Sequence, residues 1–121
     1  MGYRELIKQI QHDSGFSDQE SQEALEHTIA ALAAHLTPDE RQDLASQLPP
    51  ELQIIALAGP VPLVSVERNL LRYYQDAYDL DEARAKKQLL TVWHVLKRAI
   101  APGEINDILA QLPNETVAFL H

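Results

Sequence analysis

Hydrophobic residues recur at helical spacing along most of the chain. The clearest stripe has intervals of four, three and four residues and consists of Leu25, Ile29, Leu32 and Leu36. It predicts a helix over residues 17–36, because this spacing puts the four side chains on one helical face. Similar apolar positions predict helices over 3–13, 37–48 and 51–57. No segment alternates apolar and polar residues with β-branched enrichment, so we predict no strand.

Capping residues and prolines separate these helices. Ser17 followed by Glu20 predicts a capping box, in which Ser17 accepts a first-turn N–H and Glu20 reaches back. Thr37 followed by Pro38 and two acids is typical of another helix start. None of the seven prolines or four glycines interrupts a helical pattern. The pattern therefore predicts an all-α protein.

The sequence repeats itself with a shift of 64 residues. Residues 2–57 align on residues 66–121 without a gap, and twelve of the aligned positions are identical. About three identities would be expected by chance from average protein composition. The phrase Gln-Leu-Pro occurs at equivalent places, residues 47–49 and 111–113. The chain therefore contains two copies of one four-helix unit.

Each copy is too small to bury a large core by itself. The connector between the copies is apolar, and we expect Val61, Leu63 and Val64 to dock on the helices. We therefore predict an all-α fold of two tandem pseudo-symmetric four-helix units packed as one helical bundle. The predicted single compact domain, 1–121, consists of repeat one at 2–57, the connector at 58–65 and repeat two at 66–121.

Two longer phrases around Gln-Leu-Pro carry a family resemblance. They are Glu40-x-x-Asp43-Leu44-Ala45-x-Gln47-Leu48-Pro49 and Gly103-Glu104-x-x-Asp107-Ile108-Leu109-Ala110-Gln111-Leu112-Pro113. With the tandem layout, they resemble the bacterial domain-of-unknown-function family numbered 2267, over nearly the whole chain. The resemblance implies an all-helical cytoplasmic bacterial protein, and it implies no activity, cofactor or catalytic residue.

Composition narrows the function classes. The formal net charge is −8, which disfavours nucleic acids and anionic membranes as partners. No apolar run is long enough for a membrane helix, and the first residues are too charged for a signal peptide. The chain has no cysteine, which excludes disulfides, thiol catalysis and cysteine-ligated metals. These features favour a cytoplasmic location.

Residues with catalytic or ligating chemistry form no familiar motif. Phosphate-binding glycine loops and nucleophile or zinc motifs are missing from the sequence. The histidines at 27 and 35 have no equivalents in the second copy, so we interpret them as partly exposed helical residues rather than metal ligands. The acids Glu40 and Asp43 recur as Glu104 and Asp107. Their first-turn position favours stabilisation of the helix dipole over acid–base chemistry, so we predict neither metal nor cofactor.

Charge differs strongly between the copies. Residues 1–64 contain three bases and ten acids, whereas residues 65–121 contain seven bases and eight acids. Glu20 of the first central helix corresponds to Arg84 of the second. One interpretation is that the basic residues of the second central helix only face solvent. The alternative is that they form a basic patch for an acidic partner, such as the acidic repeat of a second copy. The candidate partner-binding residues are Arg84, Lys86, Lys87, Lys97, Arg98 and an exposed Tyr73.

Two functions follow from these patterns. The favoured one is a non-enzymatic protein-interaction or scaffold module, with a protein partner or a second copy and without nucleic acid or membrane. The alternative is a small-ligand sensor or an enzyme, with a pocket between the repeats lined by Trp93, Tyr74 and His94. Trp93 lies on the core stripe at the position equivalent to Ile29, which favours packing over ligand binding.

Overall fold

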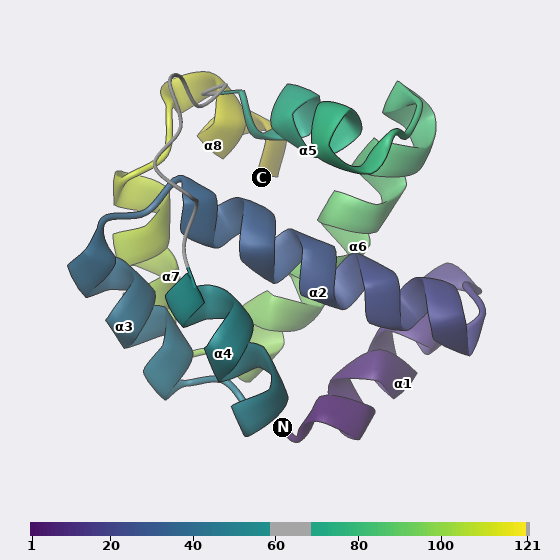
Figure 1. Ribbon diagram of the computed structural model, residues 1–121, viewed down its shortest axis with the longest axis horizontal. Helices are drawn as coiled ribbons and strands as arrows, with labels where there is room; N and C mark the ends of the chain where they lie inside the picture. The colour runs from purple at the N-terminus through teal and green to yellow at the C-terminus, as the bar shows by residue number, and fades with distance from the viewer. Residues whose placement is uncertain (59–68, 121) are drawn as a thin grey trace.

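The computed structural model describes residues 1–58 and 69–120, all of whose regular secondary structure is helical (Figure 1). The helices are α1 (Tyr3–Ser14), α2 (Asp18–Ala34), α3 (Pro38–Ser46), α4 (Pro50–Ala58), α5 (Leu70–Tyr78), α6 (Glu82–Ala99), α7 (Pro102–Ala110) and α8 (Asn114–Leu120). The predicted all-α class is therefore confirmed. The predicted docking of Val61, Leu63 and Val64 lies outside the described residues.

Helix ends recur with the same shift of 64 residues as the sequence. Gly15 and Asp79 both follow the first helix of their repeat in the left-handed conformation, with φ of 78° and 54°. Ser17 accepts a hydrogen bond from the backbone N–H three residues later, as predicted for an N-cap, and Asp81 does the same in repeat two. The other half of the predicted capping box is wrong, because the carboxylate of Glu20 turns away from Ser17 and pairs with α6.

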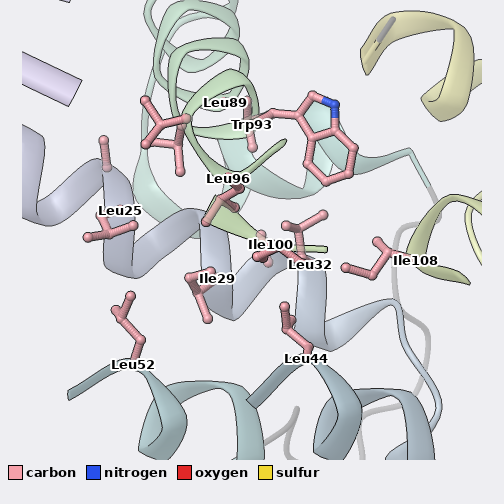
Figure 2. Close-up of a cluster of buried hydrophobic side chains, with 14 of the residues drawn as sticks. Leu25, Ile29, Leu32, Leu44, Leu52, Leu89, Trp93, Leu96, Ile100 and Ile108 are labelled. Atoms are coloured by element: carbon pink, nitrogen blue, oxygen red, sulfur yellow. The ribbon is translucent and has the colours of Figure 1, made fainter. Parts of the chain in front are cut away.

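The core forms where the two long helices meet. α2 lies across α6, and α1 and α5 each pack against both of them. The first helix of each repeat therefore contacts the central helix of the other repeat. In Figure 2, side chains from α2 and α6 converge, with α3, α4 and α7 contributing from the sides. The labelled side chains are Leu25, Ile29, Leu32, Leu44, Leu52, Leu89, Trp93, Leu96, Ile100 and Ile108.

The glutamines of the two Gln-Leu-Pro phrases join the repeats. The backbone N–H of Ala101, which precedes α7, donates to Gln47 Oε1 over 2.8 Å. In the reciprocal contact, the backbone N–H of Thr37, which precedes α3, donates to Gln111 Oε1 over 2.9 Å. Each amide thus satisfies an N–H at the start of the other repeat's third helix, and such a bond contributes about 1 kcal/mol. These bonds explain why glutamine occurs twice in the same register.

Candidate functional site

Two glutamates are buried where α3 of repeat one meets α7 of repeat two. Glu40 is 8 % exposed and Glu104 is 5 % exposed, and the shift of 64 residues makes them equivalent. Glu40 precedes Leu44 by four residues, as Glu104 precedes Ile108, so each glutamate lies on the apolar stripe of its own helix. The stripe that builds the core therefore also carries both carboxylates inward.

The buried carboxylates have too few hydrogen-bond donors. Gln111 Nε2 donates weakly to Glu40 Oε1 over 3.4 Å. Within the described part of the chain, neither Glu40 Oε2 nor Glu104 Oε2 has a hydrogen-bond partner. Buried polar atoms are normally paired, and a buried charge without a partner is costly. The α3–α7 contact therefore needs an additional positive group or a proton.

The pKa of Glu104 reflects this shortage. Burial, a hydrogen bond that Glu104 can make with Glu40 only when it is protonated, and the negative charge of Glu40 raise the pKa of Glu104 to about 8, in that order of importance. Asp43 and Asp107 raise the pKa further by repulsion. Two facing carboxylates cannot both ionise cheaply, so without a cation the pair holds a proton.

A third carboxylate completes the cluster. One oxygen from each of Glu40, Asp43 and Glu104 lies within 4.8 Å of the others. Asp43 is exposed, so water reaches one side of the cluster. From the sequence, we assigned these acids to stabilisation of the helix dipole. That interpretation did not predict the burial of Glu40 and Glu104. The burial could have been inferred from the sequence, because the same acid occurs in both copies at a position on the apolar stripe of its helix.

Two of the sequence-predicted basic residues, Arg84 and Arg98, form ion pairs inside the chain. Arg84 forms an ion pair with Glu20, its equivalent in repeat one, and its guanidinium lies 4.8 Å from the ring centroid of Phe16. Lys87 lies 5.1 Å from the same ring. Gln88 Nε2 also donates to the carboxylate of Glu20 over 3.0 Å. One pair of opposite charges at matching positions, Glu20 and Arg84, therefore meets within one molecule.

The remaining candidates lie farther along α6 or on α5. Arg98 pairs with Asp13 over 2.6 Å. Lys97 and Lys86 are exposed, but eleven residues of helix separate them, which corresponds to about 16 Å. Tyr73, expected to be exposed, is half-buried and lies edge-on to His35 at 5.2 Å. Lys97 and Arg98 therefore lie near the opposite end of α6 from Arg84, Lys86 and Lys87, and partner binding by these residues stays a prediction.

A pocket of about 170 Å³ lies beside Trp93, between α6, α7 and α8. Its lining consists of Trp93, Lys97, Ile105, Asn106, Leu109, Val117 and Leu120. This pocket lies within repeat two, not between the repeats as the sequence predicted. Tyr74 is elsewhere, fully buried, and donates to Gln88 Oε1 over 2.7 Å, while His94 is exposed. Trp93 itself is 2 % exposed and belongs to the core.

His27 belongs to an aromatic cluster. It is half-buried and stacks on Tyr78 with a centroid distance of 3.8 Å and an interplanar angle of 3°. Burial lowers the pKa of His27, against the opposing charges of Glu23 and Glu26. The stacking and burial assign a packing role to this histidine.

The outer face of α4 is unusually apolar. Ile54 is 74 % exposed and Leu57 is 53 % exposed, and they lie three residues apart on one helical face. Beside them, an open groove of about 310 Å³ is lined by Gln42, Ala45, Ser46, Gln53 and Leu57. Repeat two has the small Ala118 at the position equivalent to Ile54. We call the surface formed by Ile54, Leu57 and this groove the α4 face.

Comparison with known proteins identifies the family only. Among the described residues, no helix combines the length and apolar character needed to cross a membrane. No curated protein matches the chain. A family model described as "Uncharacterized conserved protein (DUF2267)" matches residues 3–119, which confirms the family resemblance noted in the sequence. The chain therefore belongs to the DUF2267 family.

Proposed function

We propose that this chain is a non-enzymatic protein-interaction module of the bacterial cytoplasm. The observation that carries the proposal is the exposure of Ile54 and Leu57 on one side of α4. Large apolar side chains that share a helical face and border a groove are typical of protein-binding surfaces. The absence of familiar catalytic motifs from the sequence is consistent with this function.

The charges around the α4 face indicate the chemistry of its partner. The exposed charged residues of α3 and α4 are the acids Asp39, Asp43 and Glu51, whereas their one base, Arg41, is half-buried and donates to the carbonyl oxygen of Ala33. A partner segment with apolar side chains flanked by lysine or arginine would complement this surface. An amphipathic helix has the spacing to cover Ile54 and Leu57 together.

Introduction of negative charge on the α4 face provides the test. We expect the double variant Ile54→Glu, Leu57→Glu to lose at least about tenfold in recovery of its specific partner from the native host, because apolar anchors dominate such contacts. Its melting temperature should stay within about 2 °C of the wild type, since both side chains are exposed. Affinity purification with quantitative mass spectrometry measures the first effect, and differential scanning calorimetry measures the second.

The matched control is Ala118→Glu, which adds a charge at the equivalent exposed position of repeat two. Equal recovery of every partner by the wild type and the double variant would contradict the assignment of the α4 face. Light scattering at several protein concentrations shows whether the partner is a second copy. In that case Lys86→Glu with Lys87→Glu is expected to weaken the association at low salt, because these exposed lysines can meet the acidic α3–α4 surface of a second molecule.

The pocket beside Trp93 favours a second function, the sensing of a small ligand. Its lining is mainly apolar, with Lys97 and Asn106 as polar groups, which suits a small aromatic carboxylate. Trp93 is the only tryptophan, so its fluorescence reports on the pocket directly. We expect benzoate to change this fluorescence saturably and Lys97→Met to weaken binding by about tenfold, as expected for loss of a charged partner. A linear, unsaturable response would exclude this ligand class.

A further inference from the structure

The carboxylate cluster at the α3–α7 contact has the geometry of a cation site. We propose that Glu40, Asp43 and Glu104 bind one hard divalent cation, of the Mg²⁺, Mn²⁺ and Ca²⁺ class. An oxygen from each residue lies within 4.8 Å of the other two. Oxygen ligands of these ions lie at about 2.0–2.6 Å from the metal, so they can be separated from one another by up to about 5 Å. The three oxygens can therefore contact one ion with little movement.

Burial of the two glutamates gives an independent reason for a ligand. Glu40 Oε2 and Glu104 Oε2 are buried and lack hydrogen-bond partners in the described chain, and both residues supply an oxygen to the cluster. A carboxylate that faces another carboxylate in this state needs a neutralising group between them. A divalent cation would satisfy both oxygens, offset both charges and connect α3 of repeat one to α7 of repeat two.

The donor set selects the class of cation. The three ligands supply oxygen only, which disfavours copper and zinc relative to hard ions. Exposed Asp43 leaves one side open to water, and an ion that retains several water ligands suits this arrangement. We expect a bound ion to stabilise the contact between the two repeats.

Manganese is a suitable probe because its electron paramagnetic resonance signal changes on binding. After treatment with EDTA and its removal, the full chain is titrated with MnCl₂ above pH 8. We expect one Mn²⁺ per chain and a rise in melting temperature of about 5–10 °C at a hundredfold excess over Kd. Glu104→Gln is expected to weaken Mn²⁺ binding at least about tenfold, since it replaces one charged ligand by a neutral amide of the same shape.

Asp39→Asn is the control, because Asp39 is an exposed acid of α3 outside the three-ligand group. It is expected to bind Mn²⁺ like the wild type. Equal binding by the wild type and Glu104→Gln would overturn the proposal, since the ion would then lie elsewhere. The proposal is also overturned if Mn²⁺, Mg²⁺ and Ca²⁺ neither bind nor shift the melting temperature, in which case the pair holds only a proton. Both readouts are independent of any partner of the α4 face.

Discussion

In the presence of EDTA at about pH 9, the Glu104→Gln variant is expected to melt about 5 °C above the wild-type protein. The difference is expected to shrink toward about pH 5. The amide of glutamine has nearly the shape of the carboxyl group, but it removes one negative charge from the buried pair. It can also donate a hydrogen bond to the unpartnered oxygen of Glu40. Relief of an unpaired buried charge is worth about 1–3 kcal/mol, which corresponds to several degrees in a chain of this size.

The direction of the pH effect follows from the pKa of Glu104. This pKa is about 8 in the folded protein and 4.5 in the ordinary side chain. Between these values the folded protein retains a proton that the unfolded chain releases. Folded Glu104 therefore contributes stability that is complete below about pH 4.5 and is lost as the pH rises to about 8. Glutamine does not titrate, so the variant should have the flatter stability curve.

Thermal unfolding monitored by circular dichroism in a pH series measures both effects. Asp39→Asn, which removes an exposed charge from α3, is the control for net charge and should parallel the wild type. If the melting temperatures of the wild type and Glu104→Gln differ by the same amount at all pH values, the carboxyl pair does not hold the proton described above.

Replacement of Trp93 by alanine is expected to cost about 3–5 kcal/mol in the free energy of unfolding. Trp93 is 2 % exposed, belongs to the buried core, and borders side chains of α7 and α8. Truncation leaves a cavity beside the existing pocket, and the neighbouring helices can close it only in part. In a chain of this size, the loss corresponds to a melting temperature lower by about 10–20 °C. It is also a large part of the total stability, since small domains are stable by about 5–15 kcal/mol.

Urea denaturation followed by far-ultraviolet circular dichroism measures this loss. The neighbouring substitution His94→Ala is the control, because His94 is exposed on the same helix and is expected to change stability by less than about 0.5 kcal/mol. Ile29→Ala, at the equivalent position of repeat one, is expected to cost about 2–5 kcal/mol. A loss below about 1 kcal/mol for Trp93→Ala would contradict its role in the core.

Local features of the fold could be predicted from the sequence because local interactions determine them. The stripe of Leu25, Ile29 and Leu32 predicted α2, and the hydroxyl of Ser17 caps this helix as expected. The predicted capping role of Glu20 was wrong, because a contact distant in sequence determines where this side chain lies. A capping box needs only neighbours along the chain, whereas the Arg84 partner of Glu20 comes from 64 residues away. A sequence repeat indicates that the two units have similar structures, but it does not predict which of their helices pack against each other.

The same distinction applies to the candidate sites. Glu40 and Glu104 were visible as repeated first-turn acids, but their mutual approach depends on how α3 packs against α7. The basic residues of α6 were visible too, yet intramolecular pairing of Arg84 and Arg98 depends on the placement of Glu20 and Asp13. Exposure of Ile54 could not be inferred from its chemistry, since isoleucine usually lies inside.

The contacts of α1 also have a consequence for synthesis of the protein on the ribosome. α1 packs against α6, whose residues are translated more than 65 positions later. At about 5–20 residues per second, several seconds pass before α6 can cover its side of α1. During this interval the nascent first repeat has an incompletely covered apolar helix. The risk of aggregation is therefore greatest while the second half is still being translated, and slower translation of that half prolongs it.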